Sequence, residues 1–199
     1  MTTEQEPGPE ALRGARLDGA QIRVLAHPLR IRLLGELRIQ GPATATMLAE
    51  KLDTNTGATS YHLRQLAEVG LVTEEPDLGT GRQRWWRAAH DVSSWDSSDF
   101  DGEPDASAAV EWIQAEQVRI LTEHAERWAA TQHAQPPAWR DAAGMSDIIL
   151  TIGPERLKAL NHELWQVIER YRAESASDEP GAELVSYFIA GYPRSGGVR

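Results

Sequence analysis

Cysteine is absent from the 199-residue sequence, which excludes disulfide bonds, thiolate metal ligands and a cysteine nucleophile. No apolar run approaches the length of about eighteen residues that a membrane-spanning helix needs. The N-terminal stretch MTTEQEPGPEA is acidic and lacks the apolar segment of a signal peptide. These absences predict a cytoplasmic protein that does not enter a membrane.

Positive charge is scarce overall, but it is unevenly distributed. The formal net charge is −10, yet residues 11–90 carry 11 Lys and Arg against 8 Asp and Glu. Residues 91–199 carry 9 against 19. A basic region on an acidic protein is typical of a polyanion-binding surface. The excess is small enough to arise by chance, so the charge needs support from the sequence pattern.

The basic half has five segments in a recognisable order. Residues 18–40 have helical apolar spacing, and Pro28 is expected to interrupt this run or to begin a second helix. Thr44 is expected to cap a short helix, and Thr56 to cap a longer one that ends before Gly70. Residues 71–88 are typical of a strand, a glycine-rich turn and a second strand. This order predicts a winged helix-turn-helix, and no spacing in this half indicates a catalytic site. The side chains expected to face inward from the short helix are Met47, Leu48 and Leu52.

The helix at 56–69 begins with glycine and small hydroxyl residues, which are mediocre helix formers. On a helical wheel one side is apolar and is predicted to pack on the other helices, through Thr59, Leu63, Leu66 and Val69. In a helix-turn-helix the start of the second helix enters the major groove. Small residues there allow a close approach, and hydroxyls and the helix N-terminus bind phosphates. The residues assigned to DNA contact are Thr44, Thr56, Gly57, Thr59, Ser60, Tyr61, Arg64 and Gln65.

Individual roles follow from side-chain chemistry. Arg64 can reach guanine or a phosphate, and Gln65 can reach an adenine edge. His62 lies at the border of the apolar arc and is expected to be a partly buried structural residue. In the hairpin, Arg82 is the best candidate for the minor groove or the backbone, and Arg84 is a further contact. The alternative for Ser60 and Tyr61 is that they are ordinary surface residues.

Three stretches resemble the ArsR-type winged helix-turn-helix regulators of bacteria: HPLRIRLLGEL (27–37), ATATMLAEKLDTNTGATSYHLRQLAEVGLV (43–72) and GRQRWWRA (81–88). The most specific part is the pattern S-x-H-L-x-x-L at 60–66, followed by GLV at 70–72. The resemblance implies a homodimer that binds a palindromic operator in double-stranded DNA and usually represses transcription. It also implies that many members release DNA when they bind a metal ion.

The sequence departs from that pattern at the metal sites. The thiolate site would need cysteine pairs, which the chain lacks. The family's other site would use Asp and His on the helix after the wing, where this chain has His124 and His133. Histidines nine residues apart lie on opposite faces of a helix. We therefore expect no metal and no cofactor.

The acidic half begins with a predicted polar linker at 91–107. A long helix is expected at 108–132, with apolar residues at three-four spacing and two polar interruptions. This seam either covers the helix's own domain or forms a dimer interface, in which buried polar residues can set the register. The residues assigned to dimerisation are Ile113, Gln117, Ile120, Leu121, His124 and Trp128.

A strand–helix–strand module is predicted after the long helix, with strands at 147–152 and 184–193 and a helix between them. It resembles a C-terminal extension found on a subset of the same regulators. One hypothesis gives it a small organic effector in an apolar pocket; the others are dimer stabilisation and partner binding. The candidate pocket walls are Trp112, Trp128, Trp139, Trp165 and Tyr187.

The sequence thus predicts a mainly α protein with small β elements. The predicted parts are a disordered tail at 1–14, a winged helix-turn-helix at 15–90, the linker at 91–107, and a dimerisation helix with an α+β module at 108–199. The predicted function is that of a homodimeric, cytoplasmic repressor that binds DNA, does not respond to metals and is not an enzyme. The alternatives are a protein-interaction module of the same fold and a regulator controlled by an organic ligand.

Overall fold

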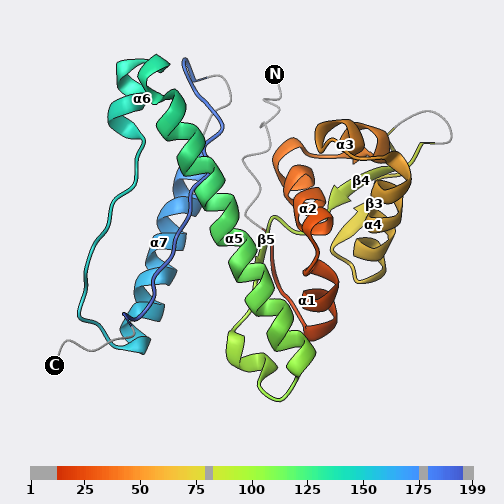
Figure 1. Cartoon of the computed structure of the whole chain (residues 1–199), viewed down its shortest axis with the longest axis horizontal. Coiled ribbons are helices and arrows are strands. Elements are labelled where there is room, and N and C mark those ends of the chain that lie inside the picture. The colour runs from red at the N-terminus through yellow and green to blue at the C-terminus, as the bar shows by residue number, and fades with distance from the viewer. Residues whose placement is uncertain (1–12, 79–82, 175–178, 195–199) are drawn as a thin grey trace, which may run out of the picture. The chain divides into compact units, whose positions relative to one another are not determined.

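A computed structural model describes residues 13–78, 83–174 and 179–194 (Figure 1). The chain forms two compact units, one within residues 12–120 and the other from residue 121 onward. The helices are α1 (Gly19–Leu25), α2 (Pro28–Gln40), α3 (Ala45–Lys51), α4 (Thr56–Glu68), α5 (Pro104–Thr131), α6 (Pro137–Ala142) and α7 (Pro154–Glu174), with 3-10 turns η1 (Ser97–Phe100) and η2 (Gln132–Ala134). The strands are β1 (Gly14–Arg16), β2 (Ala43–Thr44), β3 (Val72–Glu74), β4 (Trp85–Ala88) and β5 (Val92–Ser94).

The first two helices begin at well-formed caps. The Asp18 carboxylate accepts a hydrogen bond from the Gln21 amide at 2.8 Å, and the Gln21 side chain accepts one from the Asp18 amide at 3.0 Å. Pro28 is the first residue of α2, where its missing N–H costs nothing. His27 caps this helix through Nδ1, which accepts from the Leu29 amide at 3.1 Å. The prediction that Pro28 begins a second helix is confirmed.

The caps of α3 and α4 agree with the prediction at one position and differ at another. Thr44 caps α3, as predicted, by accepting from the Met47 amide at 3.3 Å. Asn55, not Thr56, caps α4 by accepting from the Ala58 amide at 2.8 Å. Asn55 has the extended backbone of a cap residue, whereas Thr56 is already helical. Gly70 follows α4 with φ of +72°, the left-handed conformation expected there.

A three-stranded antiparallel sheet in the order β2-β4-β3 completes the winged architecture. Ala43 pairs with Trp86, and Val72 pairs with Ala88. Trp86 is buried and Trp85 is only partly buried, so one tryptophan of the hairpin joins the core. The hairpin tip at 79–82, including Arg82, lies outside the described residues.

The core of the first unit is formed by apolar side chains from all its helices and its sheet. Leu48 is buried as predicted, and Leu52 is partly buried, but Met47 is 47% exposed, so its predicted inward position is wrong. Apolar spacing on a helix of two turns does not fix which side faces the core. The largest fully buried side chains are Ile22, Leu33, Leu34, Leu63, Leu66, Leu71 and Ile113.

The predicted linker at 91–107 is instead folded. Strand β5 pairs in parallel with β1, so Gly14 belongs to a strand rather than to the predicted tail; residues 1–12 of that tail lie outside the described part. The acidic residues of this segment form ion pairs with arginines near the start of the chain, which composition alone cannot reveal. Phe100 is buried, and α5 begins at Pro104 rather than at residue 108.

The second unit contains the predicted helix, α7, but neither predicted strand. Residues 147–152 and 184–193 are unpaired, non-helical segments. A β-strand exists only when its backbone N–H and C=O groups find a neighbouring strand, and none lies beside these segments in the described part of the chain. Their β-favouring composition is therefore not sufficient for a strand in a single copy.

Candidate nucleic-acid interface

The exposed face of α4 presents the side chains that a groove-binding helix needs. Gly57, Tyr61 and Arg64 are exposed, and Ser60 is partly exposed. The absence of a side chain at Gly57 leaves the first turn open to a close approach by another molecule. The amide groups of this first turn also carry the positive end of the helix dipole. This face is therefore suited to phosphate oxygens and base edges.

Two residues assigned to DNA contact are not available for it. Thr59 is 0% exposed, and its hydroxyl has no hydrogen-bond partner in the described residues. Thr44 is 5% exposed, and its hydroxyl is used by the α3 cap. Both predictions of contact are wrong because helix packing hides these side chains. Thr56 remains exposed at the start of α4.

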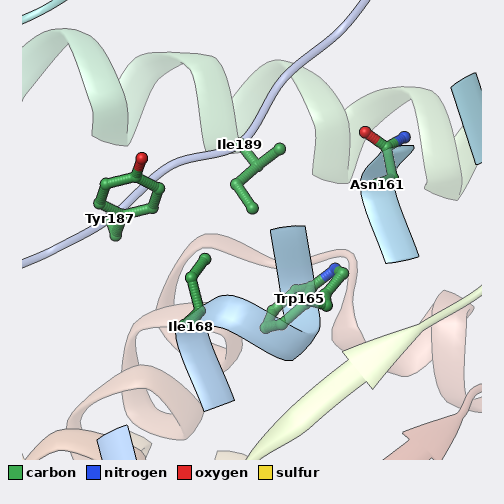
Figure 2. Close-up of a pocket in the computed structure, with 5 residues that line it drawn as sticks. All are labelled: Asn161, Trp165, Ile168, Tyr187 and Ile189. Atoms are coloured by element: carbon green, nitrogen blue, oxygen red, sulfur yellow. The ribbon is translucent and has the colours of Figure 1, made fainter. Parts of the chain in front are cut away.

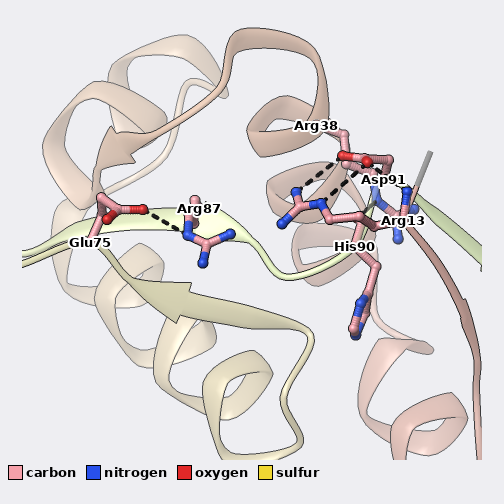
Figure 3. A network of polar contacts seen from close by, with 6 residues as sticks. All are labelled: Arg13, Arg38, Glu75, Arg87, His90 and Asp91. Carbon is pink, nitrogen blue, oxygen red and sulfur yellow. Dashed lines mark hydrogen bonds and ion pairs between the residues drawn. The ribbon is translucent and has the colours of Figure 1, made fainter. Parts of the chain in front are cut away.

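Arg64 differs from the arginines of the hairpin in its electrostatic environment. Its Nε donates to the Ser60 carbonyl at 3.1 Å, and no carboxylate pairs with it within the described residues. In contrast, Arg84 pairs with Glu74 at 2.7 Å, and Arg87 pairs with Glu75 at 2.7 Å (Figure 3). The cation of Arg64 is therefore directly available to a phosphate or a guanine, whereas Arg84 must first exchange its partner.

Gln65 is partly engaged already. Its side-chain amide nitrogen donates to Glu68 at 2.9 Å, one turn further along α4. Reading an adenine edge requires both the amide N–H and the carbonyl of Gln65. Gln65 can read adenine only after it leaves Glu68, so Arg64 is the better-placed reader of the two.

The ring of His62, on α4, contacts the ring of His27, the cap residue of α2. The rings of His27 and His62 lie 4.3 Å apart between centroids, and the Tyr61 ring lies 5.2 Å from that of His62. Burial lowers the pKa of both histidines, and the positive charge of Arg30 lowers it further. His62 is thus the partly buried structural residue that the sequence predicted. The partner His27 was missed because the two are 35 residues apart in the sequence.

Acidification is expected to destabilise this region through the histidine pair. The unfolded chain takes up protons near the ordinary pKa of 6.5, whereas the folded chain does so only at lower pH. The free energy of unfolding therefore falls as the pH drops through about 6.5, and the loss ends below the folded pKa values. Urea unfolding at pH 7.5 and 5.5 measures this change. The His62→Gln variant should lose less stability between the two pH values than the wild type. The control variant His133→Gln, changed at an exposed position, should lose as much stability as the wild type. Equal losses in all three proteins would contradict the role given to the histidine pair.

A comparison with known families identifies this part of the chain. The family model described as a helix-turn-helix domain matches residues 25–75, from the end of α1 to the end of β3. Residues 25–75 are therefore similar to a helix-turn-helix domain. No curated protein matches the sequence.

Several solved structures resemble part of this chain. One is the homodimeric winged helix-turn-helix DNA-binding domain of a possible ArsR-family transcriptional regulator from Mycobacterium bovis, with 21% identity over 49% of this chain and 76% of that chain, at a TM-score of 0.32. Another is a possible transcriptional regulator for arsenical resistance, with 28% identity over 52% and 95% of the two chains, at 0.31. A third is a transcriptional regulator homologue from Pyrococcus horikoshii, with 21% identity over 49% and 87%, at 0.32.

Arg38 connects α2 to the segment that follows the hairpin through side-chain hydrogen bonds. Its Nε donates to the His90 carbonyl at 3.0 Å, and a second nitrogen donates to Ser93 Oγ at 2.7 Å. Burial lowers the Arg38 pKa to about 10, so the group remains charged at neutral pH. The side chain lies beside Asp91, which pairs with Arg13 (Figure 3). Part of the basic excess in residues 11–90 is therefore used inside the fold and not on a binding surface.

The residues assigned to dimerisation divide between two environments. Ile113 is buried in the core of the first unit and is not free for a partner, so this assignment is wrong. Gln117 and His124 are exposed, and the His124 ring lies 5.8 Å from that of Phe188. The first half of α5 thus covers its own domain, the alternative left open by the sequence. The remaining assigned residues, Ile120, Leu121 and Trp128, are partly exposed.

The aromatic residues proposed as pocket walls do not gather at one place. Trp165 and Tyr187 line a hollow of about 210 Å³ with Asn161, Ile168 and Ile189 (Figure 2). Ligand pockets usually measure about 300–1,000 Å³, so this hollow is small. Of the others, Trp112 packs against the core of the first unit, and Trp139 donates its ring N–H to the Gly181 carbonyl at 3.2 Å.

Among the described side chains, no group of three or more His, Asp or Glu could hold a metal ion. Likewise, none of the helices in the described ranges is long and apolar enough to cross a membrane.

Proposed function

We propose that this protein is a transcriptional regulator that binds a specific sequence of double-stranded DNA through α4. The observation that carries the proposal is the open first turn of α4 beside an arginine without a carboxylate partner among the described residues. The match of residues 25–75 to a helix-turn-helix domain supports it. The start of α4 enters the major groove, where Ser60 and the helix N-terminus bind phosphate oxygens and Arg64 reads guanine.

The regulator acts as a homodimer on a palindromic operator. Two linked recognition helices bind two half-sites with a high effective concentration, which one helix lacks. The partly exposed side chains of the second half of α5 are the first candidates for the interface. Occupancy of the operator represses transcription, as the sequence resemblance implies.

Selection of genomic DNA fragments by the purified full-length protein at a fixed salt concentration tests this proposal. The expected result is strong enrichment of a few fragments that share an inverted repeat. Titration of one such fragment should then show an affinity that decreases with salt, because the protein displaces condensed counterions. If no fragment is enriched over a scrambled library, the chain is a protein-interaction module of the same fold.

Operator binding is expected not to respond to metals, because the chain has no cysteine to supply the thiolate ligands used by such regulators. Micromolar zinc, nickel and arsenite should each leave the affinity for the selected fragment unchanged in a gel-shift titration. Release of DNA by any of them would overturn this part of the proposal. A small organic effector remains the alternative trigger, and it can shift the equilibrium only by its preference for the DNA-free arrangement.

A further inference from the structure

The unit from residue 121 onward lacks a core of its own. None of its described residues is buried, although α7 has 21 residues and an apolar face. Fourteen large apolar side chains of this unit are exposed in the described residues, among them Ile148, Trp165 and Leu184. Ordering a chain of this length costs conformational entropy that apolar burial normally offsets. A unit in which no described side chain is fully buried therefore needs a partner surface.

The two segments that flank α7 show what kind of partner is missing. Residues 147–152 and 184–190 contain β-branched and aromatic residues, which favour strands. Their backbone groups make no hydrogen bond within the described chain. Ile148 is 80% exposed, and Leu184 is 76% exposed. Unpaired backbone beside exposed apolar side chains is the property of a strand that pairs with another strand.

The two segments are not paired with each other within one chain. In Figure 1, α7 is drawn between them, and the second segment runs along α7. The hollow that Tyr187 and Ile189 line together with Asn161, Trp165 and Ile168 of α7 agrees with this position (Figure 2). Each segment is therefore left without a neighbouring strand.

We propose that two copies of this protein exchange these segments to form a shared C-terminal domain. Residues 147–152 of one copy pair with residues 184–190 of the other, and the reciprocal pairing completes a closed, two-fold arrangement. The sheets cover the apolar face of α7, so that the strand–helix–strand pattern of the sequence is completed between chains. The inference rests on the homodimer proposed above and assigns its main interface to this unit.

The occupant is a second copy because the surface is self-complementary. Each chain supplies both kinds of segment, so two chains give each of the four segments one pairing strand. A stable interface uses roughly 20–30 residues on each partner, and the fourteen exposed apolar side chains provide much of that number. Their apolar character is typical of homodimer interfaces. Residues 121–194 carry 7 Lys and Arg against 11 Asp and Glu, which disfavours nucleic acid and anionic membranes as occupants.

Hydrogen–deuterium exchange of the full-length protein tests the pairing, with sedimentation measured at the same concentrations. In the dimer, the amides of 147–152 and 184–190 should exchange at least about 100-fold more slowly than free amides. This protection should disappear on dilution as the dimer dissociates. Protection that persists in the monomer would place the pairing within one chain and overturn the proposal.

Proline substitutions provide the second measurement. Ile149→Pro and Val185→Pro each place a proline inside a proposed strand, where its ring and its missing N–H disfavour pairing, and each should raise the dimer dissociation constant by at least about 100-fold. Gly144→Pro, outside the paired range, should leave it unchanged. A dimer whose segments exchange freely would overturn this inference and leave the homodimer on α5 intact. A protein that is monomeric at all concentrations would overturn both, and the DNA selection experiment would still test DNA binding independently.

Discussion

Arg64→Ala is expected to weaken binding to the selected DNA site by about 5- to 150-fold, the equivalent of about 1–3 kcal/mol. The loss should be largest for the preferred sequence, because a guanine reader contributes to discrimination as well as to affinity. Fluorescence anisotropy with the preferred site and with single-base variants at one position measures both effects. The expected pattern is a loss of preference at that position and smaller changes elsewhere.

Arg140→Ala is the matched control, because Arg140 is an exposed arginine on α6. It removes the same charge and should leave the affinity within about 0.5 kcal/mol of the wild type, as exposed substitutions away from a site usually do. Arg84→Ala should have a smaller effect than Arg64→Ala, since Arg84 is already paired with Glu74. Equal effects of Arg64→Ala and Arg140→Ala would show that α4 does not contact the DNA as proposed.

Leu48→Ala is expected to destabilise the protein by about 2–5 kcal/mol, because it leaves a cavity at a buried position of α3. Its neighbour Met47 is 47% exposed, so Met47→Ala should cost no more than about 0.5 kcal/mol. Urea unfolding monitored by circular dichroism, which follows the helices, measures both values. The pair is informative because the sequence pattern predicted both side chains inside.

The destabilisation expected for Leu48→Ala can be separated from an effect on helix formation. Both substitutions introduce alanine, the best helix former, so helix propensity opposes neither variant. Comparable destabilisation by the two would mean that α3 is rotated relative to the arrangement in the structure. A smaller effect of Leu48→Ala than of Met47→Ala would reverse the assignment of its buried face.

Local chemistry made the order of the helix-turn-helix elements predictable. Pro28 at the start of a helix, Thr44 at a cap and Gly70 in a left-handed conformation each depend on a few neighbouring residues. The period of the apolar residues identified the packed face of α4, including Leu63 and Leu66. These features depend on backbone dihedrals and on side-chain spacing along one element, both of which the sequence contains directly.

Long-range pairing was not predictable in the same way. The acidic segment at 91–107 has a linker-like composition, but Asp91 and Asp96 meet Arg13 and Arg16 at the start of the chain and hold β5 beside β1. Arg38 likewise contributed to a basic excess that the sequence assigned to DNA, although it bonds to the His90 carbonyl. Composition counts charges without showing which of them face each other.

The sequence by itself determined the helix-turn-helix elements, the Thr44 cap and the winged order of the first unit, because these follow from neighbouring residues. Only the tertiary structure decided which side chains of these elements are exposed. Thr44 and Thr59 are buried by packing, whereas Arg64 is exposed and has no carboxylate partner among the described residues. The tertiary structure also showed that Ile113 belongs to the first core, and that 147–152 and 184–193 have no neighbouring strand in one described copy. The physical reason is that burial and strand pairing are relations between distant segments, which apolar spacing and β propensity do not specify.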